Sequence, residues 1–102
     1  MVIRFGDQEF DSVIIKDHAA MRMLYRNISQ QDLGELIENG EVIEEYPDDF
    51  PFPSKLVFKQ VNNRPLHAVF AVNVRQKVLI IVTVYEPDTE KFEADFKTRK
   101  KS

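Results

Sequence analysis

A chain of 102 residues with a net charge of −3 is long enough for one hydrophobic core, so we expect a single domain spanning residues 1–102. The absence of cysteine excludes disulfides, thiolate metal sites and cysteine catalysis, and favours a reducing, cytoplasmic location. The longest apolar run, VLIIVTV at 78–84, is too short to cross a bilayer, and the acidic N-terminus lacks the pattern of a secretory signal, so no membrane association is expected.

The first 40 residues predict two short helices. Residues 2–5, VIRF, suit a short strand or an extended arm. A first helix is expected to begin near Asp17, whose carboxylate can accept from free backbone N–H groups. Ser29 and Asp32 predict the start of a second helix, which should end at Gly40 in a left-handed conformation. The apolar side of the first helix is expected to consist of Ala20, Met21, Leu24 and Ile28.

After residue 40 the apolar pattern becomes that of strands. EVIEEY at 41–46 predicts an edge strand, and the three prolines between residues 47 and 53 predict a loop. Residues 55–61, 66–74 and 77–85 predict three strands joined by short turns, and the residues after 86 a helical turn or a flexible tail. The expected fold is therefore α+β, with two N-terminal helices packed on one face of an antiparallel, mostly meander β-sheet.

Charge is segregated along the chain. Every charged residue from Glu35 to Asp49 is acidic, whereas the tail KTRKK at 97–101 is wholly basic. One interpretation is a solvated acidic edge and a frayed terminus. The other is that the acidic edge repels nucleic acid from one side and leaves a local basic site elsewhere.

Six polar side chains have the spacing to converge. Positions 18, 22 and 26 share one face of a helix, and positions 83 and 85 share one face of a strand. An antiparallel hairpin places position 67 beside the end of that last strand. The candidate cluster is His18, Arg22, Arg26, His67, Thr83 and Tyr85.

Such a cluster suits a phosphate, because guanidinium groups match phosphate oxygens and imidazole exchanges protons near neutral pH. Cleavage of RNA needs a base, an acid and cations, but no metal. Each residue also has a structural alternative, which is the commoner role for a single residue of its type. His67 could be a core histidine bonded to Thr83 or a backbone carbonyl, and Tyr85 an ordinary strand aromatic. Arg22 and Arg26 could pair with the acidic second helix. A metal-dependent hydrolase would need His18 and His67 near a shared carboxylate; no close histidine spacing indicates this, so we expect no metal ligand and no cofactor.

The motifs resemble those of a known family. A helix with His18 four residues before Arg22-Met23, RPLH at 64–67 and TVYEPD at 83–88 resemble a family of short bacterial and archaeal proteins catalogued as a domain of unknown function. More distantly, the order of elements is similar to the RelE/ParE toxin superfamily, including BrnT-type toxins. That resemblance implies a RelE-like fold and a metal-independent endoribonuclease or gyrase poison that an antitoxin neutralises.

The resulting hypothesis is a RelE-like, toxin-type, metal-independent endoribonuclease. Its expected partners are RNA, an antitoxin protein or a second copy of the chain. The alternative is a non-catalytic protein-interaction module that docks a partner through its acidic edge or an open sheet edge. Under the first hypothesis the candidate residues are catalytic His18, His67 and Tyr85, phosphate-binding Arg22 and Arg26, and supporting Thr83.

Overall fold

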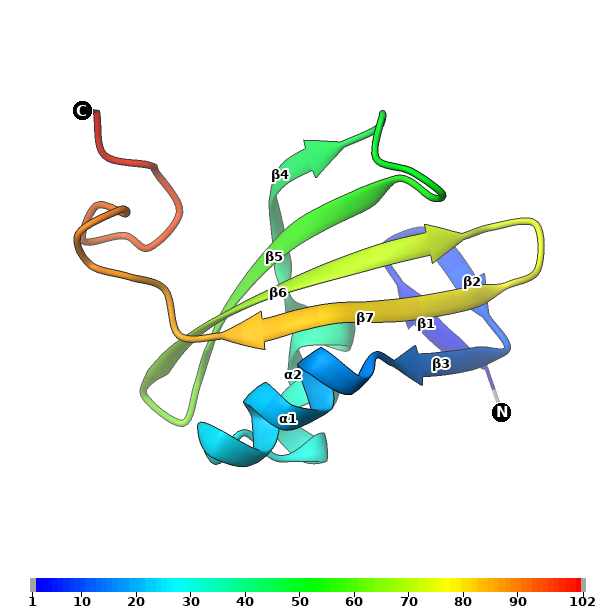
Figure 1. Cartoon of the computed structure of the whole chain (residues 1–102), viewed down its shortest axis with the longest axis horizontal. Helices are drawn as coiled ribbons and strands as arrows, with labels where there is room; N and C mark the ends of the chain where they lie inside the picture. The colour runs from blue at the N-terminus through cyan, green and yellow to red at the C-terminus, as the bar shows by residue number, and fades with distance from the viewer. Residues whose placement is uncertain (1, 102) are drawn as a thin grey trace.

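The computed structural model describes residues 2–101, which form two helices, a five-stranded sheet and a two-stranded hairpin (Figure 1). The α+β class with two helices is therefore confirmed, but three strands precede the helices. In chain order the elements are β1 (Ile3–Phe5), β2 (Gln8–Phe10), β3 (Ser12–Ile15), α1 (Asp17–Tyr25), α2 (Gln30–Asn39), β4 (Glu41–Tyr46), β5 (Ser54–Val61), β6 (Arg64–Asn73) and β7 (Val78–Tyr85).

The five-stranded sheet is mixed, with the order β3-β7-β6-β5-β4. Strands β4 to β7 pair with their neighbours in antiparallel fashion, as local turns dictate. β3 pairs with β7 in parallel, with Ile14 opposite Ile80. An entirely antiparallel sheet was thus the wrong expectation, because strands of three and four residues before α1 are too short to show an alternating pattern.

The N-terminal hairpin of β1 and β2 turns at Gly6, where φ is +62°. Such a conformation is unstrained for glycine because it has no Cβ. The hairpin brings Phe5 and Phe10 into the core, where Phe5 meets the ring of Phe70 edge-on. Residues 3–5 therefore form the expected short strand, which buries Phe5 in the core, instead of an extended arm.

α1 begins as predicted at Asp17, but its N-cap residue is Lys16 and no side chain caps it. Its buried side chains are Ala19 and Met23, whereas Leu24 is 76% exposed. The helix is therefore rotated relative to the predicted apolar side. The cause is its position beside β7, in line with β3, which selects a different face from the one that hydropathy suggests.

α2 has the predicted capping box. The Ser29 hydroxyl accepts from the Asp32 amide at 3.0 Å, and the Asp32 carboxylate accepts from the Ser29 amide at 2.9 Å. Gly40 follows the helix with φ −70°, so the expected left-handed conformation is wrong. Glycine is required there for space, because a Cβ would overlap the Leu36 carbonyl and the Val57 side chain.

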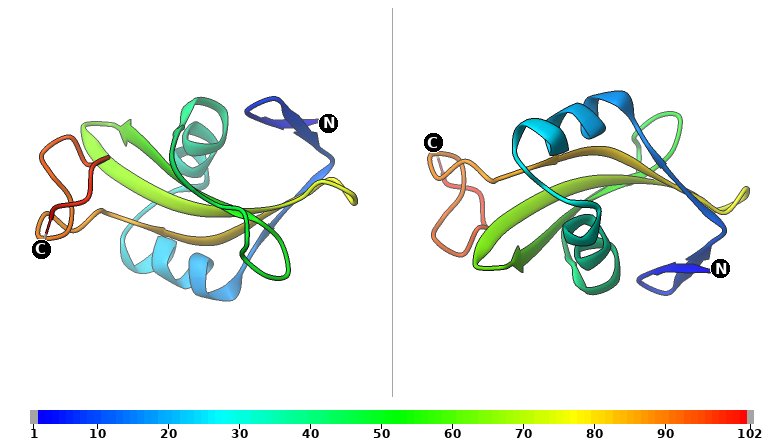
Figure 2. Two further views of the ribbon diagram at one scale, coloured as in Figure 1. Left: turned by 90° about the horizontal axis from the view of Figure 1, so that it is seen from above. Right: turned by 90° about the horizontal axis from the view of Figure 1, so that it is seen from below.

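The two helices do not share one face of the sheet. α2 packs against β5, β6 and β1, whereas α1 packs along β7. In Figure 2 the helices lie on different sides of the curved strands, because α1 lies at the sheet edge beside β7, although its buried Ala19 and Met23 join the same core as α2. As a result the end of α1 lies near the end of β7.

The central strands present two different faces. Ala68, Phe70 and Val84 are fully buried in the core with α2. Because side chains alternate along a strand, His67, Thr83 and Tyr85 point to the opposite side. We call this side the open face. The 47–53 loop lies at one end of it and the C-terminal segment, residues 86–101, at the other.

The C-terminal segment folds back on itself without forming a helix. The Glu93 amide donates to the Thr98 carbonyl at 2.8 Å, and the Lys100 amide donates to the Lys91 carbonyl at 2.8 Å. Phe92 is buried beneath this loop. Within residues 2–101, neither helix has the length and apolar character needed to span a membrane.

Candidate anion-binding site

A basic hollow of about 450 Å³ opens where α1, the end of β7 and the C-terminal segment meet. It has three arginines and one lysine against two carboxylates. A surplus of positive charge in a concave surface favours an anion. The residues lining this basic hollow are Arg22, Arg26, Tyr85, Glu86, Asp88, Lys91, Phe92 and Arg99.

The first two arginines come from the end of α1. Arg22 lies in the last turn and Arg26 is the C-cap residue, so both project from one side of the helix. Both are exposed, and neither forms an ion pair within residues 2–101. The sequence alternative that they pair with α2 is therefore not what the structure shows. Both line the hollow.

Arg64 anchors this end of α1. Its guanidinium donates to the Asn27 carbonyl at 3.1 Å and to the Arg26 carbonyl, and its Nε lies 2.6 Å from a Glu86 carboxylate oxygen. The contact fixes the helix end against the residue that follows β7. Glu86 lines the hollow, but its negative charge is paired with Arg64.

Tyr85, the last residue of β7, also lines the hollow. Partial burial raises the pKa of this phenol above its usual value, while the positive charge of Arg99 opposes the rise. The charge of Arg22 acts on the Tyr85 pKa in the same direction as Arg99. The phenol is therefore protonated near neutral pH and can donate a hydrogen bond to a bound anion.

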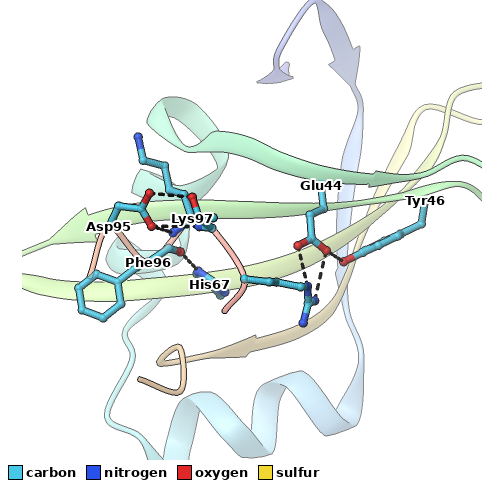
Figure 3. Close-up of polar contacts among 8 residues, drawn as sticks. Glu44, Tyr46, His67, Asp95, Phe96 and Lys97 are labelled. Atoms are coloured by element: carbon cyan, nitrogen blue, oxygen red, sulfur yellow. Dashed lines mark hydrogen bonds and ion pairs between the residues drawn. The ribbon is translucent and has the colours of Figure 1, made fainter. Parts of the chain in front are cut away.

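Arg99 enters the hollow from the C-terminal segment. Its Nε lies 2.7 Å and its Nη2 3.2 Å from the two carboxylate oxygens of Glu44 on β4. The guanidinium also lies 5.0 Å from the centre of the Phe92 ring. Hydrogen bonding to Arg99 lowers the pKa of Glu44, which also accepts from the Tyr46 hydroxyl (Figure 3). The third arginine is therefore held in place rather than free.

His67 lies beside the hollow but is not part of its surface. Its side chain is fully buried, with Nε2 2.6 Å from the Phe96 carbonyl oxygen (Figure 3). A carbonyl can only accept, so Nε2 carries the proton. Nδ1 is buried without a hydrogen-bond partner. Burial lowers the pKa of the imidazole, and His67 is therefore neutral near pH 7.

Aromatic rings enclose this histidine. The imidazole centre lies 4.7 Å from that of Phe92, 5.5 Å from Tyr85 and 5.9 Å from Phe58. Phe96 stacks on Phe58 at 6.4 Å. Two of these rings belong to the C-terminal segment, which therefore separates His67 from solvent.

The segregated charges of the sequence meet in the fold. Lys97 pairs with Glu41 at 3.3 Å, and Arg99 pairs with Glu44, so the basic tail lies on the acidic edge strand. Neither a frayed terminus nor a free acidic edge describes this arrangement. The ion pairs link the C-terminal segment to β4.

The structure brings together three of the six candidates in the hollow: Arg22, Arg26 and Tyr85. His67 contacts the Tyr85 ring from below. Thr83 lies opposite Val69 on the open face, and His67 bonds to Phe96 instead of to Thr83. His18 is exposed on α1, outside the residues that line the hollow. Within residues 2–101, no group of three potential ligands is arranged to hold a metal ion.

Sequence reasoning missed Lys91 and Arg99. Both come from the segment read as a turn or a tail, and their positions depend on contacts with strands far away in the chain. The alternation of Phe92 and Phe96 with charged residues is the one local signal that this segment packs against the sheet.

Of three comparisons with known proteins, one found a match. Residues 15–86 match the model of a family described as a domain of unknown function, DUF4258. The matched range includes Arg22, Arg26, His67 and Tyr85 and ends before Lys91. No curated protein matches the chain, and no solved structure does.

Proposed function

Because the chain belongs to the DUF4258 family, described as a domain of unknown function, we propose its activity from the basic hollow: it binds a phosphodiester of RNA there and acts as a RelE-like, toxin-type, metal-independent endoribonuclease. The observation that carries the proposal is the meeting of three guanidinium groups and a protonated phenol in one hollow.

The hollow suits a phosphate better than a single carboxylate. Arg22 and Arg26 present forked donors that are free of ion pairs within the described residues, so two phosphate oxygens can be contacted at once. Arg99 adds positive charge while Glu44 holds it in position. Tyr85 donates a further hydrogen bond without adding charge.

Cleavage by this site would follow the internal transesterification of RNA. The ribose 2′-oxygen bonds to phosphorus, the bond from phosphorus to the 5′-oxygen breaks, and the products are a 2′,3′-cyclic phosphate and a 5′-hydroxyl. The 2′-hydroxyl loses its proton to a base, and the leaving 5′-oxygen takes one from an acid. The guanidinium groups stabilise the negative charge on phosphorus, and Tyr85 is placed to supply the proton.

Proton abstraction by His67 requires a conformational change. Neutral His67 has an unprotonated Nδ1 and contacts Tyr85, but the C-terminal segment covers it. Under the proposal, the 92–96 part of the segment moves when RNA binds while Arg99 stays paired with Glu44, and His67 then accepts the 2′-hydroxyl proton with Thr83 in a supporting role. His18, at the start of α1, is the second candidate for the general base. Substituting each histidine in turn distinguishes the two.

RNA binding is tested by fluorescence anisotropy with a labelled single-stranded oligoribonucleotide in buffer containing EDTA. Arg22→Ala and Arg26→Ala should each weaken binding about tenfold, the loss expected for a charged hydrogen bond. Each should also lower the salt dependence, by about 0.7 in the slope of log affinity against log salt. Arg75→Ala is the matched control, because Arg75 is exposed in the turn between β6 and β7, outside the hollow.

Cleavage is tested with the same protein by resolving the RNA fragments and their ends. Fragments with 2′,3′-cyclic phosphate ends that Arg22→Ala and His67→Ala abolish would support the nuclease. Growth arrest on induced expression, lost in the same soluble variants, would support a toxin and justify a search for a neutralising protein. Absence of RNA binding by the folded wild type, or an equal loss in Arg75→Ala, would contradict the proposal and favour a non-catalytic interaction module.

A further inference from the structure

A second hollow, of about 300 Å³, lies on the open face at the end away from the C-terminal segment. Its floor consists of apolar strand residues from β6 and β7, and its wall is the loop before β5. We call it the loop hollow. It is lined by Lys16, Asp49, Phe50, Pro51, Phe52, Ser54, Val69, Ala71, Ile80 and Val82.

The two hollows share one surface of the sheet. Tyr85 lines the basic hollow and Ile80 lines the loop hollow, and both side chains point to the open face of β7. The two residues are five positions apart on an extended strand, which corresponds to about 16 Å. Val69 and Thr83 face each other between the two ends. A single strand of RNA held by a phosphate in the basic hollow can therefore continue along the open face.

The loop hollow has the chemistry of a base-binding surface. Phe50 is 95% exposed, more than any other large apolar side chain described, and it stands beside an apolar floor. An exposed aromatic ring next to an apolar surface offers a stacking platform for a flat nucleobase, whatever the sequence. The arrangement is unlike an isolated exposed apolar residue, which needs no explanation.

The lining of the loop hollow includes one cation and one anion, Lys16 and Asp49. Lys16 is exposed at its edge and forms no ion pair among residues 2–101, so it can meet a backbone phosphate. The Asp49 carboxylate is the opposing charge, and it accepts a hydrogen bond from Ser54. The hollow thus combines an apolar base surface with one available cation.

We propose that the loop hollow binds the base of a nucleotide that lies a few positions along the strand from the phosphate in the basic hollow, by stacking on Phe50. This inference rests on the proposed RNA binding and adds the substrate class, a single-stranded RNA longer than a dinucleotide. A duplex would keep its bases paired and could not offer one to Phe50.

The test compares a dinucleotide with a hexanucleotide of the same base. The hexanucleotide should bind more tightly to the wild type, and Phe50→Ala should weaken its binding about tenfold, the value of one stacked base. The affinity for the dinucleotide should not change in this variant, because the dinucleotide reaches only the basic hollow. Val74→Ala, which removes an exposed apolar side chain outside both hollows, is the control.

Phe50→Trp gives a direct readout, because the chain has no tryptophan of its own. Its indole should retain hexanucleotide affinity, and its fluorescence should be quenched by the hexanucleotide but not by the dinucleotide. Two results would overturn the base site and still support the basic hollow. One is quenching of the indole fluorescence by the dinucleotide but not by the hexanucleotide. The other is wild-type hexanucleotide affinity in Phe50→Ala together with weakened affinity in Arg22→Ala. Quenching that depends on protein concentration without RNA would assign the loop hollow to a second copy of the chain.

Absence of binding by either RNA would overturn the proposed function itself. The two failures are therefore distinguishable: one is specific to Phe50 and to length, and the other affects the wild type with every RNA. Circular dichroism of Phe50→Ala and Phe50→Trp should match that of the wild type, since the side chain is almost entirely exposed.

Discussion

The imidazole of His67 donates from Nε2 to the backbone carbonyl of Phe96 across 2.6 Å, and this bond joins β6 to the C-terminal segment. The donor is fully buried, and its second nitrogen has no partner. Protonation would add a charge and a second N–H without an acceptor to this buried site, so the closed arrangement favours the neutral imidazole. The hydrogen bond between His67 and Phe96 therefore links the protonation state of His67 to the position of the C-terminal segment.

Acid should destabilise the protein through His67. Its pKa is lowered in the folded state, mainly by burial, whereas in the unfolded chain it is about 6.5. The unfolded state therefore binds the proton first, and the stability present above pH 6.5 falls as the pH is lowered toward the folded-state pKa. The slope for this one proton cannot exceed about 1.4 kcal/mol per pH unit.

The measurement is urea unfolding at pH 7.5 and pH 5.5 for the wild type, His67→Gln and His18→Gln. Glutamine at 67 can still donate to the Phe96 carbonyl but does not titrate, so this variant should lose less stability between the two pH values. The other groups that act on His67 do not titrate in this window, since the pKa of Glu44 is lowered by Arg99 and that of Arg99 is raised by Glu44. An unchanged pH dependence in His67→Gln would contradict the prediction.

The aromatic contacts of the C-terminal segment should control access to His67. Phe92 is 4% exposed and lies 4.7 Å from the imidazole, so Phe92→Ala should loosen the segment at the cost of a few kcal/mol of local stability. Diethyl pyrocarbonate modifies accessible histidines. We expect rapid modification of exposed His18 in both proteins, and of His67 only in the variant.

Peptide mass spectrometry assigns the modified residue, and His18 is an internal control for the amount of reagent. Equal and rapid modification of His67 in the folded wild type would show that the segment opens without help. Resistance of His67 in Phe92→Ala would show that Phe96 and the ion pairs hold the segment closed without the ring.

Features of the fold that depend on neighbours in the chain were predictable. The capping box of α2 needs only Ser29 and Asp32, and the turn between β5 and β6 needs residues that tolerate positive φ, which Asn62 and Asn63 adopt. The parallel pairing of β3 with β7 joins residues more than 60 positions apart, and four residues of sequence contain no signal for it. The mixed sheet was therefore beyond local reasoning.

The same division holds for the candidate site. A spacing of four on a helix was sufficient to place Arg22 and Arg26 together. The contribution of Arg99 depends on the C-terminal segment folding back onto β4, which its own composition does not encode. For His67 a bond to a backbone carbonyl was one of the alternatives, but only the fold identifies Phe96 as the partner. Its catalytic role stays a prediction.

The ion pair between Arg99 and Glu44 should contribute modestly to stability. The Glu44 side chain is 24% exposed and that of Arg99 54%, and pairs of this kind contribute about 0.2–1 kcal/mol. Arg99 also packs on the Phe92 ring, so Arg99→Gln should destabilise more than Glu44→Gln.

A double-mutant cycle with Glu44→Gln and Arg99→Gln isolates the interaction free energy between the two side chains. Urea unfolding at low and high salt measures it. We expect a coupling of about 0.5 kcal/mol that decreases in high salt. The more exposed pair of Lys97 and Glu41 is the comparison, with a smaller coupling. A coupling of zero at low salt would mean that the pair does not hold the segment.

The two glycines at α2 should respond in opposite ways to alanine. Gly34 lies inside the helix, and a Cβ built there meets nothing within 4 Å. Alanine lowers the entropy of the unfolded chain and favours the helix, so Gly34→Ala should stabilise by about 0.5–1 kcal/mol. At Gly40 a Cβ would overlap the Leu36 carbonyl and Val57, so Gly40→Ala should destabilise by about 1–3 kcal/mol.

Thermal and urea unfolding of the two variants measure this difference, and the substitution is chemically the same in both. Because the φ of Gly40 is −70°, its loss of stability cannot come from backbone strain and must come from the close approach of β5 to the end of the helix. Combining Gly40→Ala with Val57→Ala would relieve one of the two overlaps. A partial recovery relative to the sum of the single effects would locate the cause at Val57, and strict additivity would locate it at the Leu36 carbonyl.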